Sequence, residues 1–313
     1  MWDRLIVAGY WFVYIALELS ILFLGISFLI GVLTTYVSPQ KVERILSKYG
    51  KGLIGNMLGT LFGGILPFCS CSTIPALIGL LKVGIPFRIA MSFLIASPLG
   101  VLNAAVFSLF YVMFGAKVAI SYIAVTFIGA VIAGFVLDRL GLKVQLKRVS
   151  VVGGHEEEPP AAPPRATLLG RVKPKLVSSW GFTKDLYLRM VPYLLIGVGI
   201  GAFIYGFVPD DLLATYAGPS NIFAVPIAAA LGVPMYVRTE TMIPLCYALF
   251  EKGMGLGTMM ALIIGGAGIS IPEMTLLSAI FKRKLLTAYI LTVFIIATLT
   301  GYLFNAFGPL LMA

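Results

Sequence analysis

Long apolar stretches fill most of the chain and alternate with short segments that carry lysine and arginine. The stretches 52–81, 212–237 and 285–313 contain no Asp, Glu, Lys or Arg. An uncharged apolar segment of roughly 18 residues or more is long enough to cross a bilayer as a helix. The pattern therefore predicts an all-α polytopic membrane protein.

The composition agrees with this class. Of the 313 residues, 59% are hydrophobic and 12% are charged, whereas a soluble domain carries about 25% charged residues. This excludes a soluble enzyme, and the chain has no Walker A motif for ATP phosphates. We expect no enzymatic activity and no cofactor. We attribute the net charge of +10 to membrane topology rather than to nucleic-acid binding.

One polar segment divides the chain. Residues 139–184 combine charges with Gly153-Gly154 and several prolines, a composition that cannot bury a core and predicts disorder. We therefore predict a first membrane repeat (1–140), a partly disordered cytoplasmic linker (141–184) and a second membrane repeat (185–313).

The two apolar parts repeat one another at a constant offset of 169 residues, the difference between 69 and 238. Gly63 falls on Gly232, and Gly84 falls on Gly253. At the same offset, the run Cys69-Ser70-Cys71-Ser72-Thr73-Ile74-Pro75 falls on Arg238-Thr239-Glu240-Thr241-Met242-Ile243-Pro244. The low-identity but gap-free register predicts an internal repeat.

Each repeat contains the same series of apolar segments. A first span is followed by two short pieces that are too short to cross a bilayer upright, and then by two full spans. We therefore predict three transmembrane helices plus a re-entrant helical hairpin, or two short helices, in each repeat. The segments are 10–36, 53–67, 72–82, 87–113 and 117–138 in the first repeat, and 187–208, 221–236, 241–251, 255–280 and 285–307 in the second.

The basic residues orient these segments. Cytoplasmic loops are enriched in Lys and Arg, and one topology puts most of the 23 basic residues, including those of the linker, on the cytoplasmic side. Three crossings per repeat turn the second repeat upside down relative to the first. Inverted repeats with broken helices that meet near the midplane are typical of secondary transporters.

The tip of the first hairpin carries two thiols. Pro67 and Pro75 are expected hinges of this hairpin, and a helix that begins between them presents free N–H groups that favour a thiolate. Two adjacent thiols form a soft site for trivalent arsenic, Cu(I) or reactive sulfur. The alternative is that the cysteines are small packing residues. The candidate substrate-binding residues are Cys69, Ser70, Cys71, Ser72 and Thr73.

The tip of the second hairpin is charged instead. Arg238 and Glu240 could bind an anion and a proton, or could pair with each other to fix the hairpin. Pro234 and Pro244 are its expected hinges, and the candidate substrate-binding residues are Arg238, Thr239, Glu240 and Thr241. A zinc site needs four ligands, which the chain does not readily supply, so no metal site is predicted.

Carboxylates in apolar segments are candidates for proton coupling. Glu240 and Glu273 are the first choices and Glu18 follows them. Asn103 lies one position from the counterpart of Glu273 in the first repeat, so we include it in the candidate pathway. The alternative for Glu273 is a hydrogen-bonded residue in helix packing.

Four segments resemble a known family. The runs Leu66–Pro75, Gly84–Pro86, Ala96–Pro98 and Gly265–Glu273 are similar to those of the bacterial and archaeal predicted permeases, whose characterised branch is the ArsP-type organoarsenical efflux permeases. The resemblance implies an eight-span permease of the prokaryotic plasma membrane that exports trivalent organoarsenicals such as methylarsenite by proton exchange. Ligation of arsenic by Cys69 and Cys71 is the corresponding hypothesis from their thiol chemistry. The expected partners are the small-molecule substrate and the lipid bilayer; nucleic acid is not expected, and a homo-oligomer is left open.

Three functions therefore remain open from the sequence. The first is efflux of a thiophilic solute through the Cys69-Ser70-Cys71 tip. The second is a permease for a sulfur-containing or other small anion, suggested by Arg238 and the two helix N-termini. The third is a membrane thiol–disulfide relay, which would need a partner thiol such as Cys246.

Overall fold

The computed structural model describes residues 52–65, 70–147, 223–234, 238–251 and 253–312, with scattered residues of 9–32 and 179–196. The side chains of 70–72 and of 309–312 are not part of this description. The predicted spans 10–36 and 187–208 and most of the linker lie largely or wholly outside the described residues.

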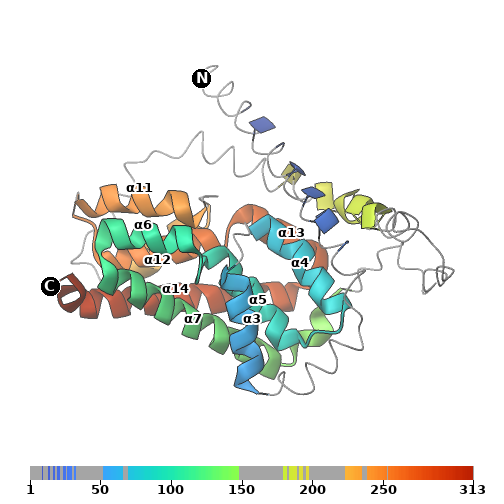
Figure 1. Ribbon diagram of the computed structural model, residues 1–313, viewed down its shortest axis with the longest axis horizontal. Coiled ribbons are helices and arrows are strands. Elements are labelled where there is room, and N and C mark those ends of the chain that lie inside the picture. Colours follow the sequence, from blue (N-terminus) through green and yellow to red (C-terminus); the bar gives the residue numbers. More distant parts are fainter. Residues whose placement is uncertain are drawn as a thin grey trace, which may run out of the picture.

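The described part of the first half is a chain of helices joined by short connections (Figure 1). Its elements are α3 (Leu53–Ile65), α4 (Ser70–Lys82), α5 (Phe87–Leu99), α6 (Ala104–Phe114), α7 (Ala116–Arg139) and the 3₁₀ helix η1 (Leu142–Gln145). The described part of the second half contains α10 (Ala224–Gly232), α11 (Thr239–Glu251), α12 (Leu256–Gly268), α13 (Ile271–Ile280) and α14 (Arg283–Met312).

Two of the described helices are long and apolar enough to cross a membrane. They are α7, with 24 residues, and residues Arg283–Gly308 of α14, with 26 residues. The pairs α5–α6 and α12–α13 each have the composition of a span but bend by 46° and 41° at a short break. The described residues therefore contain two candidate spans, or up to four if each bent pair counts as one.

These bends differ from the continuous helices expected over 87–113 and 255–280. In the first break, Gly100 ends α5 with φ +58°, a left-handed conformation that glycine adopts without strain. In the second break, Ile269 leaves helical geometry with φ −141° and ψ 43°, and Pro272 occupies the first turn of α13, where it needs no N–H partner. Apolar composition predicted the length of each span but not its interruption.

The helices of the two halves correspond at the offset of 169 residues up to the two breaks. Both ends of α4 and α11 obey this offset, and so do both ends of α5 and α12. Each of α4 and α11 contains one internal proline, Pro75 and Pro244. After the breaks the offset becomes 167, because α6 begins at 104 and α13 begins at 271.

Close helix packing explains a pair of matched glycines. A Cβ atom on Gly63 would lie 2.5 Å from the carbonyl oxygen of Phe93, and one on Gly232 would lie 2.7 Å from that of Leu262. Such distances are too short for any side chain, so α3 packs on α5, and α10 on α12, only because glycine lacks a Cβ.

The helices α7 and α14 run in opposite directions. The segment after α7 pairs with the segment before α14: the Lys147 N–H donates to Ile280 O and the Lys282 N–H donates to Gln145 O, both at 2.8 Å. The two helices cross where Gly129 meets Ile296, and these residues are themselves 167 positions apart. The first residues of the predicted linker are thus attached to the second half.

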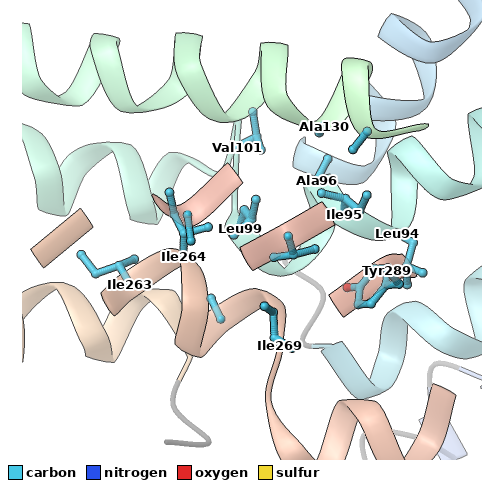
Figure 2. Close-up of a cluster of buried hydrophobic side chains, with 14 of the residues drawn as sticks. Leu94, Ile95, Ala96, Leu99, Val101, Ala130, Ile263, Ile264, Ile269 and Tyr289 are labelled. Atoms are coloured by element: carbon cyan, nitrogen blue, oxygen red, sulfur yellow. The ribbon is translucent and has the colours of Figure 1, made fainter. Parts of the chain in front are cut away.

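The two halves share one apolar core. Figure 2 shows Leu94 and Leu99 of α5 in the same cluster as Ile263 and Ile264 of α12 and Tyr289 of α14. The short helices also contact the opposite half: α11 packs on α6 as well as on α12, and α4 packs on α13 as well as on α5 (Figure 1).

Candidate functional site

The start of α11 is anchored at the break between α5 and α6. The Thr239 hydroxyl donates a hydrogen bond of 2.7 Å to the carbonyl oxygen of Pro98. The side-chain amide of Asn103 donates a 3.0 Å bond to Oε1 of Glu240. Thr239 and Asn103 are 3% and 8% exposed, so these two contacts join the second hairpin tip to the first half in a largely buried position.

Asn103 is oriented by a second contact. It is the N-cap of α6, and its Oδ1 accepts a 2.9 Å bond from the Ala105 N–H. Because the amide oxygen faces the helix, the amide nitrogen is directed to the Glu240 carboxylate. Glu240 itself lies in the first turn of α11, where the positive end of the helix dipole favours a carboxylate.

The start of α4 approaches the same end of α5. The Thr73 and Ser97 hydroxyls form a buried hydrogen bond of 3.0 Å. Thr73 lies in the first turn of α4, and Thr239, bound to Pro98, is the first residue of α11. The first turns of α4 and α11 are therefore attached to adjacent residues, Ser97 and Pro98, in the last turn of α5.

Not all predicted substrate residues can be located. Ser70, Cys71 and Ser72 lie in the first turn of α4, but their side chains are not described; Cys69 and Pro67 lie outside the described residues. Arg238 directly precedes α11 and is exposed, and its carbonyl oxygen accepts a 2.9 Å bond from the exposed Thr241 hydroxyl.

Of the predicted hinges, Pro234 comes directly after Val233, the C-cap of α10. Pro75 and Pro244 lie inside α4 and α11 rather than at the hairpin tips. Cys246 is a buried residue of α11.

The break between α12 and α13 holds a buried carboxylate. Glu273 has no exposed surface, and the Tyr289 hydroxyl donates to its Oε1 at 3.0 Å. The same hydroxyl contacts the carbonyl oxygen of Gly268, the last residue of α12, at 3.1 Å. Glu18 lies outside the described residues, so it cannot be compared with Glu273.

The tyrosines at the breaks were not among the predicted residues. Tyr122 donates to the carbonyl oxygen of Leu99 at 2.9 Å, which matches the contact of Tyr289 with Gly268. Leu99 and Gly268 are 169 positions apart but the tyrosines only 167, so a search at one fixed offset misses the pair. At the offset of 167 that holds after the breaks, Ser270 is the counterpart of Asn103, and both residues are N-caps. Glu273 then corresponds to Val106.

The described residues contain no group of three or more His, Cys, Asp or Glu side chains that could hold a metal ion. The described short helices instead meet at a junction that contains hydroxyl groups and single carboxylates. Apolar helices of membrane-spanning length surround this junction. These features define a helical membrane protein.

Sequence comparison identifies the family. Residues 7–306 match the predicted permease family ArsP_1, and the chain belongs to this family. The family resemblance noted from the hairpin motifs is thereby confirmed.

Two curated relatives are similar to this chain. The UPF0718 protein MJ0584 of Methanocaldococcus jannaschii is 36% identical over 132 residues, which cover 42% of this chain and 36% of that protein. The UPF0718 protein YcgR of Bacillus subtilis is 24% identical over 272 residues, which cover 86% of this chain and 88% of that protein. No solved structure matches the chain.

Proposed function

We propose that this permease is a secondary transporter built from two inverted repeats, whose hairpin tips form the solute site near the midplane of the plasma membrane. The observation that carries the proposal is the attachment of both tips to the last turn of α5, through Thr73–Ser97 and Thr239–Pro98. The matching helix bounds and the opposed directions of α7 and α14 support the inversion.

We propose a thiophilic small solute, with trivalent organoarsenicals such as methylarsenite as the first choice and export as the direction. Cys69 and Cys71 in the first tip supply soft ligands that suit trivalent arsenic. Each thiol that binds replaces one hydroxide on arsenic, and the thiol proton leaves with that hydroxide as water. The second tip contributes the Glu240 carboxylate and the exposed Arg238.

Glu240 is the proposed proton-coupling residue, because it takes part in a contact that must change when the halves move. Rocking of one repeat against the other would break the Asn103–Glu240 and Thr239–Pro98 hydrogen bonds. Protonation of Glu240 removes the charge that strengthens the bond to the Asn103 amide, so proton uptake would favour separation of the tip from α6.

The test is methylarsenite uptake by everted membrane vesicles that contain the wild type or the Cys69→Ser/Cys71→Ser variant. Uptake by the wild type alone is expected. Uptake by both would retain the permease and reject the thiols as ligands, and uptake by neither would reject the arsenical substrate.

A small anion is the second candidate substrate. It is favoured by Arg238, which lies exposed at the beginning of α11, where free N–H groups add to its positive charge. Arg238→Glu should then abolish flux of a small sulfur-containing anion such as thiosulfate, while Arg238→Lys retains part of it. Unchanged thiosulfate flux in Arg238→Glu would reject this candidate.

A further inference from the structure

The N-cap of α13 carries a hydroxyl group that the fold does not use. Ser270 has extended geometry, with φ −71° and ψ 149°, but its side chain makes no capping bond. The residue is 1% exposed, and its Oγ has no hydrogen-bond partner among the described residues. A buried hydroxyl without a partner costs free energy, and a bound ligand would offset that cost.

A carboxylate lies one helical turn beyond this hydroxyl. Ser270 and Glu273 have the spacing of a capping box, in which a serine bonds to the helix N–H groups, yet Ser270 makes no such bond. The N-cap and N3 residues of a helix lie near each other at the start of that helix. The unused hydroxyl and the fully buried Glu273 carboxylate therefore both lie at the start of α13.

A third group of oxygen atoms comes from the end of α12. The last carbonyl groups of a helix have no partner within that helix and carry its negative dipole end. Gly268 is the last residue of α12, and its carbonyl oxygen and Glu273 Oε1 both contact the same Tyr289 hydroxyl. One hydroxyl group thus bridges the carbonyl end of α12 and the carboxylate of α13.

We propose that the α12–α13 break binds a sodium ion through Ser270 Oγ, the Glu273 carboxylate and carbonyl oxygens at the end of α12. All of these donors are oxygen atoms, which suit a hard cation. One carboxylate balances one positive charge, whereas the described residues offer no acidic cluster for a divalent ion. Unwound carbonyls and half-helix C-termini are known to coordinate sodium in transporters.

The equivalent break in the first half provides an internal contrast. There Asn103 replaces Ser270 and uses its side chain as an ordinary cap, and Val106 replaces Glu273. This break has neither an unused cap oxygen nor a carboxylate of its own, so the cation site is specific to the second half.

The site deepens the proposed transport function by naming sodium as a second coupling ion beside the proton that we assign to Glu240. It rests on the proposed function only for this coupling role, because cation binding itself does not depend on transport. α13 packs on α4, and Cys71 has in α4 the register that Glu240 has in α11. A cation at the break would therefore lie on the helix that adjoins the proposed thiol tip. Cation binding is measured without transport, so the two proposals can fail separately.

The first experiment measures thermal unfolding of the purified full chain in sodium, potassium or choline chloride at equal ionic strength. A bound cation stabilises only the folded state, so sodium should raise Tm in a saturable manner and the other two salts should not. Binding of radiolabelled sodium to the wild type checks the same site without any substitution. Equal Tm values in sodium and choline, or no retained radiolabel, would overturn the proposal.

Two substitutions locate the effect. Ser270→Ala should keep or raise Tm in choline, because it removes an unused buried hydroxyl, yet weaken the apparent sodium affinity at least tenfold. Glu273→Gln should abolish the sodium response. A full response to sodium in both variants would place the cation elsewhere and overturn the assignment.

Thr258→Val is the matched control. Thr258 also carries a buried hydroxyl without a partner among the described residues, but it lies near the opposite end of α12. This variant should respond to sodium like the wild type. If it loses the response as Ser270→Ala does, the effect reflects general loosening of α12 and the proposed site is wrong.

Discussion

The two helix breaks occupy equivalent places in the two halves, but they are built differently. The first contains four residues, 100–103, between α5 and α6, and the second contains two, 269–270, between α12 and α13. At the first break Asn103 caps its own helix and binds Glu240 of the other half. At the second break, the Ser270 side chain does neither, and the carboxylate is that of Glu273 in α13, the helix that Ser270 precedes. One break thus joins the halves, whereas the other gathers polar groups of its own half.

The largest expected effect is on transport and concerns Glu240, the carboxylate of the second half that binds Asn103 at the first break. Glu240→Gln keeps a side-chain oxygen for Asn103 but cannot exchange a proton. Accumulation of methylarsenite driven by a pH gradient in everted vesicles should fall at least tenfold. Glu251→Gln is the matched control, because Glu251 is an exposed residue at the other end of α11. Equal accumulation by Glu240→Gln and wild type would reject proton coupling at this residue.

The next prediction compares the two N-caps directly. Asn103→Ala removes a helix cap and a hydrogen bond to a carboxylate, and should cost about 2–3 kcal/mol of unfolding free energy. Ser270→Ala removes a hydroxyl with neither role and should cost nothing in sodium-free buffer. Thermal unfolding of both variants measures the difference. Comparable losses would mean that the breaks do not differ as described.

The two tyrosines give a smaller contrast. Tyr289→Phe removes a bond to the Glu273 carboxylate, whereas Tyr122→Phe removes a bond to the Leu99 carbonyl. Bonds to charged groups contribute about 1 kcal/mol more than neutral ones. Tyr289→Phe should therefore be the more destabilising by about 1 kcal/mol in thermal unfolding. The reverse order would contradict a charge-strengthened bond between Tyr289 and Glu273.

The smallest effect is expected at Thr239. Thr239→Val keeps the shape of the side chain but loses the bond to Pro98 O, at a cost of about 1 kcal/mol. Because this bond joins the two halves, Thr239→Val should lower Tm in thermal unfolding, while Thr241→Val, at an exposed position of the same helix, should not. Identical Tm values for the two variants would contradict the anchoring role of Thr239.

Much of the helical arrangement could be predicted from charge-free apolar segments and from the repeat. The bounds expected for the short helices agree with α3, α4 and α11 within a few residues, because Gly and Pro mark their ends. Ser97-Pro98 and Gly265-Gly266 indicate irregular helix geometry close to the two breaks. The full breaks at Gly100 and Ile269 come from the structure, since an apolar segment looks the same whether it is one helix or two. Glu240 and Asn103 were each identified as candidates, but their contact arises from packing of α11 on α6, which no local pattern encodes.

The roles of Cys69, Cys71, Arg238 and Glu18 remain predictions from the sequence. The constant offset of 169 does not pair Tyr122 with Tyr289, because the offset changes from 169 to 167 at the breaks. The spacing of Ser270 and Glu273 is that of a capping box, but the Ser270 side chain makes no capping bond.

The unequal length of the two breaks also has an evolutionary meaning. If both halves descend from one duplicated gene segment, a change of two codons at a single site accounts for the shift in register, while α5 and α12 before the breaks kept the same length of 13 residues. Glycines that allow close packing, such as Gly63 and Gly232, would be relics of the ancestral half. Asn103 and Ser270 would then mark the position at which the two copies became free to acquire separate tasks.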